Sequence, residues 1–360
     1  MKIVHVTEAW NGGISTYVNT LLRHQSRGHQ VALVYSSNQT NADFNAAALS
    51  EAGVQLFPYQ SSRNPSKLLG ISRKVQSILN DLQPDVVHLH STFAGVYGRL
   101  FKRFPTVYCA HGWSFTQEEG ELRKQIYARA ERWLSRRTNA IINISQHEQQ
   151  QARLYGIKAP VHEVVLTGTE DAPTSQPPAA LREDAIAKTI NLGFVGRLDD
   201  KKGFDILESI FKNNPPDNVR LFVLGEPRRN NRAFLPQNTP AITYIGWVEN
   251  NRIDDYIRML DAVIIPSRQE GFGIVVLEGM RNGKPAIVSN RGALPELVKE
   301  GVNGHVFNLA DAAHELPLLL AGLEKEKLRQ MGQTARQMYE DNFTAARFVA
   351  DIEAIYRKLS

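Results

Sequence analysis

The pattern of apolar and polar residues alternates between two kinds of segment along the whole chain. Short runs rich in valine and isoleucine, without polar residues in alternation, predict strands that are covered on both faces. The stretches between them, such as 13–27 and 65–83, have the periodicity of amphipathic helices. This alternation favours parallel sheets with crossover helices. The predicted strands are 3–7, 30–35, 54–59, 86–90, 106–110 and 140–144 in the first half, and 191–195, 220–224, 242–245, 262–265, 286–289 and 305–308 in the second.

A proline-rich break separates the two halves. It contains the sequence APTSQPP at residues 172–178, which is typical of a linker. We therefore predict an α/β protein with two Rossmann-like domains that face each other across a cleft. An amphipathic pattern at 341–359 follows both domains, so this segment is predicted to be a helix that packs back on the first domain. The predicted parts are a first domain at 1–170, a linker at 171–188, a second domain at 189–340 and a closing segment at 341–360.

Length and composition restrict the class of protein. A chain of 360 residues has room for two domains of ordinary size, each with its own core. The single cysteine, Cys109, lies in an apolar run, which excludes a disulfide framework and a thiolate metal site and indicates a reducing compartment. The first residues resemble a strand rather than a signal peptide, and no stretch of about 18 apolar residues is present. We therefore expect a cytoplasmic protein without a membrane span.

The segment EGFGIVVLE, residues 270–278, carries the strongest indication of chemistry. It follows an apolar predicted strand and leads into a helical pattern that begins at Ile274. The glycines on either side of Phe272 let backbone N–H groups approach a ligand at the positive end of a helix dipole. Glu270 and Glu278 add two carboxylates that can accept hydrogen bonds from hydroxyls. A phosphate together with hydroxyls describes a sugar nucleotide, whereas the alternative is an ordinary strand–turn–helix with a solvated glutamate.

Two cations follow the first predicted strand of the second domain. Val195-Gly196-Arg197-Leu198 ends that strand, and Lys201-Lys202-Gly203 precedes the next helix. The carboxyl ends of parallel strands are where open α/β sheets bind ligands. Arg197 and Lys202 suit a diphosphate, because a guanidinium binds it as a fork and an ammonium as a point charge. Solvated surface charges are the alternative interpretation of both residues.

The first domain offers two candidate positions. Trp10-Asn11-Gly12-Gly13 follows the first predicted strand and opens a helix, where backbone amides can face an anion. His111-Gly112-Trp113 ends another predicted strand, so His111 is expected to project into the cleft, although a lone histidine is more often structural. The dinucleotide-binding pattern Gly-x-Gly-x-x-Gly follows none of the predicted strands, and this disfavours a dehydrogenase.

Taken in order, these motifs resemble the retaining glycosyltransferases of the GT-B fold, and glycosyltransferase family 4 in particular. The similarity extends over nearly the whole chain. Two stretches depart from the family pattern: Arg291-Gly292-Ala293 has one glycine where two are frequent, and Pro227-Arg228-Arg229 is more basic than usual. The stretches that match are Gly12-Gly13, His111-Gly112, Val195-Gly196-Arg197-Leu198 with Lys202-Gly203, Glu270-Gly271-Phe272-Gly273 with Glu278, Pro295-Glu296-Leu297-Val298, Gly301-Val302-Asn303-Gly304 and the closing segment 343–356.

The resemblance implies sugar transfer from a nucleotide diphosphate sugar with retention of the anomeric configuration. The nucleotide is expected on the second domain and the acceptor, a glycan or a lipid-linked molecule, on the first; UDP is favoured over GDP. The implied catalytic residues are His111 near the reacting carbon, Arg197 and Lys202 on the diphosphate, and Glu270 on the hydroxyls of the transferred sugar. The implied donor-binding residues are Gly12, Gly13, Gly196, Val248 beside the base, Gly271, Phe272, Gly273, Ile274 and Glu278 on the ribose.

The resemblance also implies that no metal and no other cofactor is required. The sequence agrees, because it has no Asp-x-Asp at a predicted strand end, and arginine, lysine and a helix N-terminus can replace a divalent cation. The acidic pairs Asp199-Asp200 and Asp254-Asp255 are predicted to supply negative charge at the start of helices. Two other classes stay open: a nucleotide-sugar epimerase on the same scaffold, and a non-catalytic nucleotide-sugar-binding partner subunit.

Residues 121–137 carry six basic and two acidic residues, a local excess close to the net charge of +5 of the whole chain. Leu122, Ile126, Ala130, Trp133 and Leu134 form an apolar stripe, while Lys124, Arg129, Arg132 and Arg136 spread over the opposite face of the predicted helix. A solvated basic face is one interpretation. The other is a peripheral contact with an anionic membrane surface, which suits a lipid-linked or lipopolysaccharide acceptor. A nucleic-acid partner is not expected, because no binding module surrounds these residues.

Overall fold

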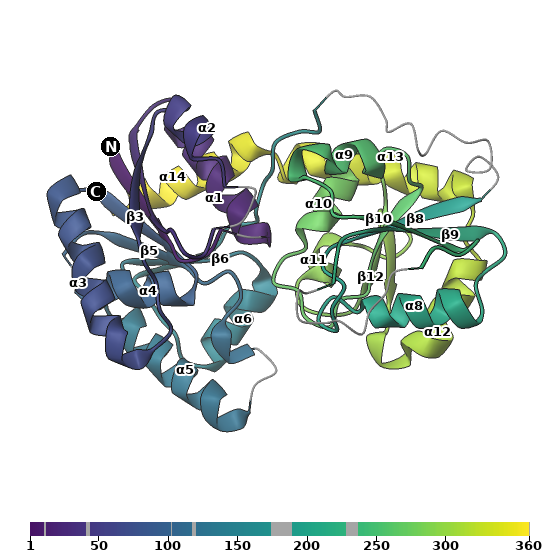
Figure 1. Cartoon of the computed structure of the whole chain (residues 1–360), viewed down its shortest axis with the longest axis horizontal. Coiled ribbons are helices and arrows are strands. Elements are labelled where there is room, and N and C mark those ends of the chain that lie inside the picture. The colour runs from purple at the N-terminus through teal and green to yellow at the C-terminus, as the bar shows by residue number, and fades with distance from the viewer. Residues whose placement is uncertain are drawn as a thin grey trace. The chain divides into compact units, whose positions relative to one another are not determined.

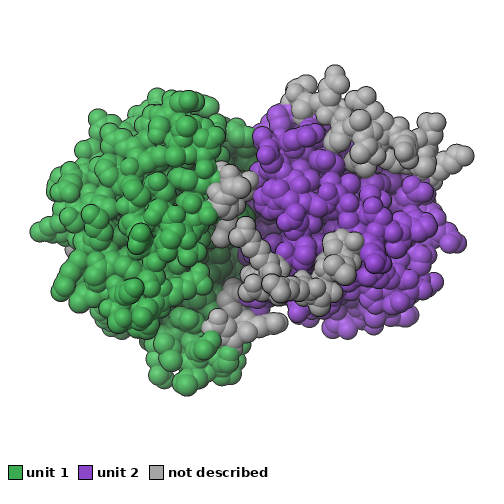
Figure 2. Space-filling view, in the orientation of Figure 1, with its two compact units in different colours: residues 1–170, 344–360 green, residues 171–343 purple. Residues whose placement is uncertain are grey.

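The computed structural model describes residues 1–10, 12–40, 44–101, 103–116, 120–173, 189–227 and 237–359. The chain divides into two compact units, one formed by Met1–Glu170 with Thr344–Ser360 and the other by Asp171–Phe343 (Figure 2). Residues 174–188, most of the predicted linker, lie outside the described residues, as do Arg228 and Arg229.

The first unit is built on a parallel seven-stranded sheet with the order β3-β2-β1-β4-β5-β6-β7 (Figure 1). Its central strands are buried because helices cover both faces, and this explains why valine and isoleucine occupy them almost without interruption. The strands are β1 (Lys2–Thr7), β2 (Gln30–Ser36), β3 (Val54–Tyr59), β4 (Val86–His90), β5 (Thr106–Cys109), β6 (Ala140–Asn143) and β7 (Val161–Val164).

Strand β7 was not among the predicted strands. Among the described strands it pairs with β6 alone, at the edge of the sheet, and each of its residues is partly exposed. An edge strand needs no continuous apolar run, so VHEV gives almost no signal in the sequence.

The helices of the first unit include one that the chain supplies at its far end. Helix α14 (Ala345–Arg357) packs against α1 (Gly12–Gln25), and Figure 1 shows the two side by side. The predicted start of this helix at residue 341 is wrong. Thr344 caps its first turn by accepting from the N–H of Arg347, and residues 341–342 still belong to the preceding helix. The other helices are α2 (Ala46–Glu51), α3 (Pro65–Leu82), α4 (Thr92–Arg99), η1 (Ser114–Thr116), α5 (Glu121–Ser135) and α6 (Gln146–Leu154).

The second unit repeats the scheme with a parallel six-stranded sheet of order β10-β9-β8-β11-β12-β13. Its strands are β8 (Ile190–Val195), β9 (Val219–Leu224), β10 (Ile242–Gly246), β11 (Ala262–Ile265), β12 (Ala286–Ser289) and β13 (Gly304–Phe307). Its helices are α8 (Phe204–Asn213), η3 (Asn250–Arg252), α9 (Ile253–Ile257), α10 (Ile274–Arg281), α11 (Leu294–Leu297), η4 (Leu309–Asp311), α12 (Ala312–Ala321) and α13 (Lys325–Asn342).

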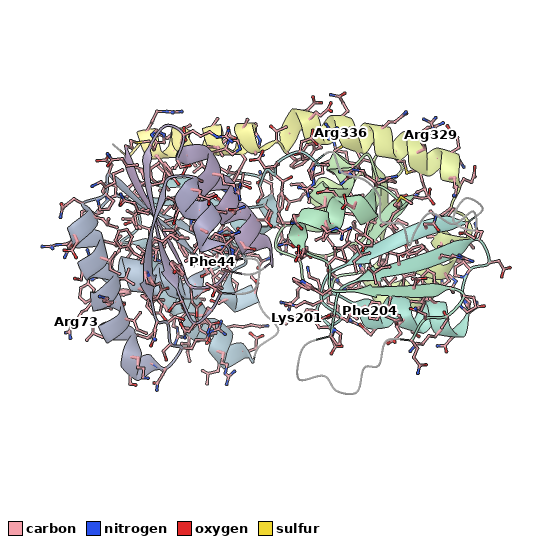
Figure 3. All side chains as sticks on the ribbon, turned by 45° about the horizontal axis from the view of Figure 1, so that its top comes forward. Phe44, Arg73, Lys201, Phe204, Arg329 and Arg336 are labelled. Carbon is pink, nitrogen blue, oxygen red and sulfur yellow. The ribbon has the colours of Figure 1, made fainter. Side chains whose placement is uncertain are left out.

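The start of the second unit is held by ion pairs. The guanidinium of Arg336, on α13 (Figure 3), donates to both carboxylate oxygens of Asp171, at 2.5 and 2.8 Å. The guanidinium of Arg258 donates to the carbonyl oxygen of Pro173. These contacts assign residues 171–173, which were predicted as linker, to the second unit.

Strand order reverses once in each sheet, between β1 and β4 and between β8 and β11. Open α/β sheets bind ligands outside the carboxyl ends of the strands at such a switch point. The loops after β8 and β11 carry the Arg197–Lys202 and Glu270–Glu278 motifs, so topology alone places both motifs at one position. None of the helices in the described part of the chain combines the length and the apolar character needed to cross a membrane.

Candidate functional site

The centre of the candidate site is an ion pair between two loops that are 68 residues apart in the sequence. The Lys202 ammonium donates to Oε2 of Glu270 at 2.6 Å, and Ser267 Oγ donates to the same oxygen at 3.3 Å. The Lys202 and Glu270 side chains are 26% and 14% exposed, so both reach solvent. The structure therefore brings together one cation and one carboxylate of the predicted site.

The two loops can approach only because glycines stand at the contacts. Gly203 has a φ of 70°, and a Cβ there would lie 2.0 Å from the carbonyl oxygen of Pro266. Gly292 has a φ of 58°, and a Cβ there would lie 2.0 Å from the carbonyl oxygen of Glu270. The one glycine retained in Arg291-Gly292-Ala293 is thus the one that backs Glu270. Figure 3 labels Lys201 and Phe204, which lie on either side of the Lys202-Gly203 turn.

Helix α10 begins beside this pair with an open N-terminus. Gly273 precedes it with a φ of 105° and offers no side-chain cap. Among the described residues, the backbone N–H groups of Ile274 and Val275 have no acceptor. Unsatisfied amides at the positive end of a helix form an anion-binding position.

Glu278 lies one turn further along α10 and is half-buried. Within the described ranges its carboxylate has neither a hydrogen bond nor an ion pair. Burial raises the pKa of the Glu278 carboxyl to about 7; Asp254 acts in the same direction, whereas Arg281 and Lys202 oppose it. A carboxylate that is held near a lysine without a protein partner is available to accept hydrogen bonds from ligand hydroxyls.

The prediction that Asp254-Asp255 acts only as charge at a helix start is incomplete. Both residues lie in the first turn of α9, but both are buried. Arg281 donates to the two carboxylate oxygens of Asp254 at 2.8 Å each, and Asn282 donates to the same group. This pair joins α9 to the end of α10, because a buried carboxylate requires a charged partner.

Arg197 occupies the loop after β8 and is half exposed. Its Nε donates to Oδ2 of Asp199 at 3.0 Å. Asp199 also accepts from the backbone N–H of Lys202 at 3.0 Å, so it caps the turn that presents the lysine. Gly196 holds the start of this loop with a φ of 148°. In the described part of the chain Arg197 makes no hydrogen bond or ion pair with Lys202 or Glu270, so the two cations lie in one loop without contacting each other.

The position predicted for the base follows β10. Gly246 ends the strand with a φ of 83°, the Trp247 side chain is 53% exposed, and Val248 is partly exposed beside it. A large exposed indole at a strand end offers a flat face for stacking.

In the first unit, the predicted glycines stand where α1 begins. Gly12 has a φ of 52° and is the first residue of the helix, followed by Gly13; Asn11 lies outside the described residues. A Cβ at Gly12 would meet nothing within 4 Å, so this turn is open.

His111 lies after β5 in a left-handed conformation, with a φ of 54°. Its Nε2 is 3.1 Å from Nδ1 of His90, and its Nδ1 is 3.7 Å from the sulfur of Cys109. Burial lowers the pKa of the His111 imidazole to about 3, so the ring is neutral at physiological pH. The ring of Tyr17, from α1, meets it edge-on at 4.5 Å. Both ring nitrogens of His111 thus have protein groups as neighbours, and the expected position of His111 facing a cleft stays a prediction.

Two residues that support the site, Ser267 and Glu148, were not predicted. Ser267 shares the oxygen of Glu270 that Lys202 binds, and Glu148 accepts from the N–H groups of Gly112 and Ile144 at 2.6 and 2.7 Å, which fixes the loop that carries His111. The contact of Glu148 with Gly112 joins segments 36 residues apart, whereas Ser267–Glu270 and Ile144–Glu148 are local contacts. The sequence shows only a serine after a strand and a glutamate near a helix start.

Each unit is a parallel α/β sheet, and the second unit has an open helix N-terminus and two carboxylates at its switch point, where such sheets bind ligands. Residues 11–171 match the family model Glycosyltransferase Family 4, and residues 182–338 match Glycosyl transferases group 1. The chain belongs to glycosyltransferase family 4, group 1, and is a glycosyltransferase of the GT-B fold.

Three known proteins illustrate the similarity. An uncharacterized 41.2 kDa protein in the cps region of Klebsiella pneumoniae is 29% identical over 326 residues, which are 87% of each chain. The UDP-Gal:α-D-GlcNAc-diphosphoundecaprenol α-1,3-galactosyltransferase of Escherichia coli is 25% identical over 292 residues, 76% of this chain and 75% of that one. The crystal structure of Anabaena HepE in complex with UDP has a TM-score of 0.81 and 20% identity, with 100% of both chains covered.

Proposed function

We propose that this glycosyltransferase moves a sugar from a nucleotide diphosphate sugar, a UDP-sugar in preference to a GDP-sugar, to a glycan or lipid-linked acceptor, with retention of the anomeric configuration. The observation that carries the proposal is the Lys202–Glu270 pair at 2.6 Å, beside the open N-terminus of α10. A cation, two free amides and a carboxylate at one switch point match the phosphate and hydroxyl groups of such a donor.

In this proposal the diphosphate is held by charge from three sources. An ammonium has three N–H donors, so Lys202 can keep Glu270 and still bind a phosphate oxygen. Arg197 adds a guanidinium, and the N–H groups of Ile274 and Val275 complete the cradle next to Gly273. These groups stabilise the charge that develops on the leaving phosphate during transfer, so we propose that no divalent cation is required.

The two carboxylates have separate tasks in this proposal. Glu270 accepts hydrogen bonds from hydroxyls of the transferred sugar, because it lies beside the cation that holds the phosphate. Glu278, which is unpartnered in the described part of the chain, accepts from the hydroxyls of the ribose. Trp247 and Val248 would lie beside the base, and His111 near the reacting carbon.

The relatives support both the donor and the acceptor class. The Escherichia coli enzyme uses UDP-Gal and a diphosphoundecaprenol acceptor, HepE is described with UDP, and the Klebsiella protein comes from a cps region. We therefore propose a role in the synthesis of surface polysaccharide or lipopolysaccharide, in the cytoplasm and on the inner face of the membrane.

Helix α5 supports the membrane part of the proposal. Leu122, Ile126 and Trp133 are 72%, 55% and 47% exposed, and their spacing places them on one face of the helix. The expected stripe needs one correction, since Leu134 is buried in the core. Glu131 is buried as well.

The excess of positive charge on α5 is larger at the protein surface than in the sequence, because one of its two glutamates is buried. Glu131 pairs with the buried Arg99 at 2.8 Å, so its negative charge is neutralised inside the unit. Arg129, Arg132 and Arg136 are exposed beside the apolar stripe. Exposed apolar residues flanked by arginines are typical of a helix that lies on an anionic membrane.

Vesicle sedimentation tests this surface. Wild-type protein is expected to bind phosphatidylglycerol vesicles at low salt and to release them at high salt, with little binding to phosphatidylcholine. Reversing Arg129, Arg132 and Arg136 to glutamate should abolish binding. The control variant reverses Lys67, Arg73 and Lys74 on α3 to glutamate, which makes the same change in net charge. An equal loss of vesicle binding in both variants would contradict a specific membrane-binding surface on α5.

Nucleotide release tests the function itself. UDP-sugars and GDP-sugars are incubated with and without a bacterial lipid extract, with EDTA present throughout. A transferase releases nucleotide faster with the extract, and NMR of the product shows whether the anomeric configuration is retained. An epimerase would change the sugar without releasing nucleotide, and a non-catalytic subunit would do neither. Absence of acceptor-stimulated release with every donor would contradict the proposal.

A further inference from the structure

A continuous chain of hydrogen bonds runs through the core of the first unit and ends at His111. It begins at Gln25 on α1, whose Oε1 is 2.8 Å from Nε2 of His5 on β1. Nδ1 of His5 is 2.9 Å from Nε2 of His90 on β4, and Nδ1 of His90 is 3.1 Å from Nε2 of His111. This series of hydrogen bonds therefore joins helix α1 to strands β1 and β4 and to the loop that follows β5.

The three imidazoles that these hydrogen bonds link, those of His5, His90 and His111, are neutral. His5 and His90 are fully buried, and burial lowers the pKa of His5 to about 4 and that of His90 well below its usual range. A neutral imidazole has one N–H donor and one acceptor nitrogen. If one ring nitrogen donates, the other must accept. The tautomer of one ring therefore determines the tautomer of the next ring to which it is hydrogen-bonded.

The amide of Gln25 sets the direction. Its Oε1 can only accept, so Nε2 of His5 carries the hydrogen and Nδ1 of His5 accepts from His90. Nδ1 of His90 then accepts, so Nε2 of His111 must donate. Nδ1 of His111 is then an acceptor, and among the described residues its one hydrogen-bonding neighbour is the Cys109 sulfur, at the long distance of 3.7 Å.

The backbone holds the end of the chain in place. His111 has a φ of 54°, and Ser91, which follows His90, has a φ of 74°. Left-handed conformations of residues other than glycine persist only where their surroundings enforce them, and they cluster at functional sites. Glu148 supplies part of that enforcement through the N–H of Gly112, at 2.6 Å.

We propose that Gln25, His5 and His90 are positioning residues that hold His111 in its Nε2–H tautomer, so that Nδ1 is presented to a ligand as a hydrogen-bond acceptor. The proposal rests on the proposed function, in which His111 contacts the donor sugar. It adds that Nδ1 of His111 accepts a hydrogen bond from a sugar hydroxyl in place of the Cys109 thiol. It also adds that the buried residues Gln25, His5 and His90 determine that His111 is the acceptor in this contact.

Histidine-labelled protein tests the tautomer directly. Two-bond proton–nitrogen correlation spectra distinguish Nε2–H, Nδ1–H and charged imidazoles, and the His111 signal is identified by its loss in His111→Gln. The free wild-type protein should show Nε2–H at His111, His90 and His5 at neutral pH. A neutral Nδ1–H tautomer or a charged ring at His111 would overturn the proposal without any variant of the chain.

Variants then separate positioning from mere packing. His90→Phe and Gln25→Leu interrupt the chain at different points, and both should convert His111 to a mixture of tautomers. The control is His88→Phe: His88 is equally buried on β4, but its Nδ1 bonds to the hydroxyl of Tyr356 and it lies outside the chain. His88→Phe should leave the tautomer of His111 unchanged; the same conversion in this control would mean that general loosening of the core is responsible.

Binding shows the consequence at the site. His90→Phe should weaken UDP-glucose by about three- to tenfold, the size of one neutral hydrogen bond, and leave UDP unchanged. An equal loss for UDP would refute a contact with the sugar. If the wild type binds neither probe, the proposed function fails, whereas the spectra of the free protein still decide the tautomer.

Metal binding offers an independent check. His5, His88 and His90 have ring nitrogens within 4.8 Å of one another. Stoichiometric retention of Zn²⁺, with shifts of all these rings, would mean that the cluster is a metal site and would overturn the proposal. No effect of Zn²⁺ on the spectra is the expected result.

Discussion

Replacing Glu278 by glutamine removes a carboxyl whose pKa the fold raises to about 7 from a usual value of 4.5. The raised pKa means that the folded protein prefers the neutral carboxyl. The contribution of the neutral carboxyl to the free energy of unfolding is therefore fully present below pH 4.5, and it is lost as the pH rises through about 7. One pKa unit corresponds to about 1.4 kcal/mol, so this pKa difference changes the free energy of unfolding by about 3 kcal/mol. Glutamine cannot ionise, so the variant keeps its stability at high pH.

The assay is urea-induced unfolding of wild type and Glu278→Gln at a series of pH values. The variant should gain stability relative to wild type, by up to about 3 kcal/mol, between pH 4.5 and pH 7, and the difference should stay constant above that range. Glu249→Gln is the control, because Glu249 is exposed in the same unit. A difference that does not change with pH would refute the raised pKa, and a carbon-13 titration of labelled glutamates would show the pKa directly.

Ligand binding should change in the opposite sense. The ionised Glu278 is the better acceptor for ribose hydroxyls, so the affinity of wild type for a UDP-sugar should rise as the pH passes through about 7. A UDP-sugar is preferable to UDP, because a terminal phosphate itself titrates near pH 6. Glu278→Gln should bind more weakly and without this pH dependence, by about 1.5–3 kcal/mol where the carboxylate is ionised. An unchanged pH profile in the variant would remove Glu278 from the site.

Other predictions concern the loops around the Lys202–Glu270 pair. Gly203→Ala should destabilise the second unit by more than about 3 kcal/mol, since its Cβ would lie 2.0 Å from the carbonyl oxygen of Pro266. Gly301→Ala, at the same φ of 70° but with nothing within 4 Å, should cost about 1–2 kcal/mol, and equal melting temperatures for the two variants would contradict the close approach. Glu270→Ala should keep its affinity for UDP while sugar transfer falls, so lost UDP affinity in calorimetry would show that Glu270 serves the nucleotide instead.

All described strands except β7 were predictable from the sequence, because parallel strands covered by helices need an apolar residue at nearly every position. Strand β7 could not be predicted, since an edge strand with partly exposed residues has no such need. The start of α14 was misplaced because residues 341–342 continue α13, and only the cap at Thr344 marks the boundary.

The part of the candidate site that could be predicted is the part formed by motifs at the ends of neighbouring strands. Topology brings the loops after β8 and β11 together, so Lys202 and Glu270 could be grouped before their contact was known. The burial of Asp254 could not be predicted, because its partner Arg281 lies 27 residues away and nothing local indicates it. The surroundings of His111 were missed for the same reason: its neighbours come from separate strands and a helix.

Calorimetric titration of UDP into Arg197→Ala/Lys202→Ala tests the central claim most directly. Each charge-assisted contact contributes about 1.5–3 kcal/mol, so the double variant should bind UDP at least about 100-fold more weakly than wild type. Lys201→Ala, which removes a neighbouring exposed cation of the same loop, should change the affinity little. Unchanged UDP affinity in the double variant, with the fold intact, would contradict the phosphate role of both residues and with it the proposed mechanism.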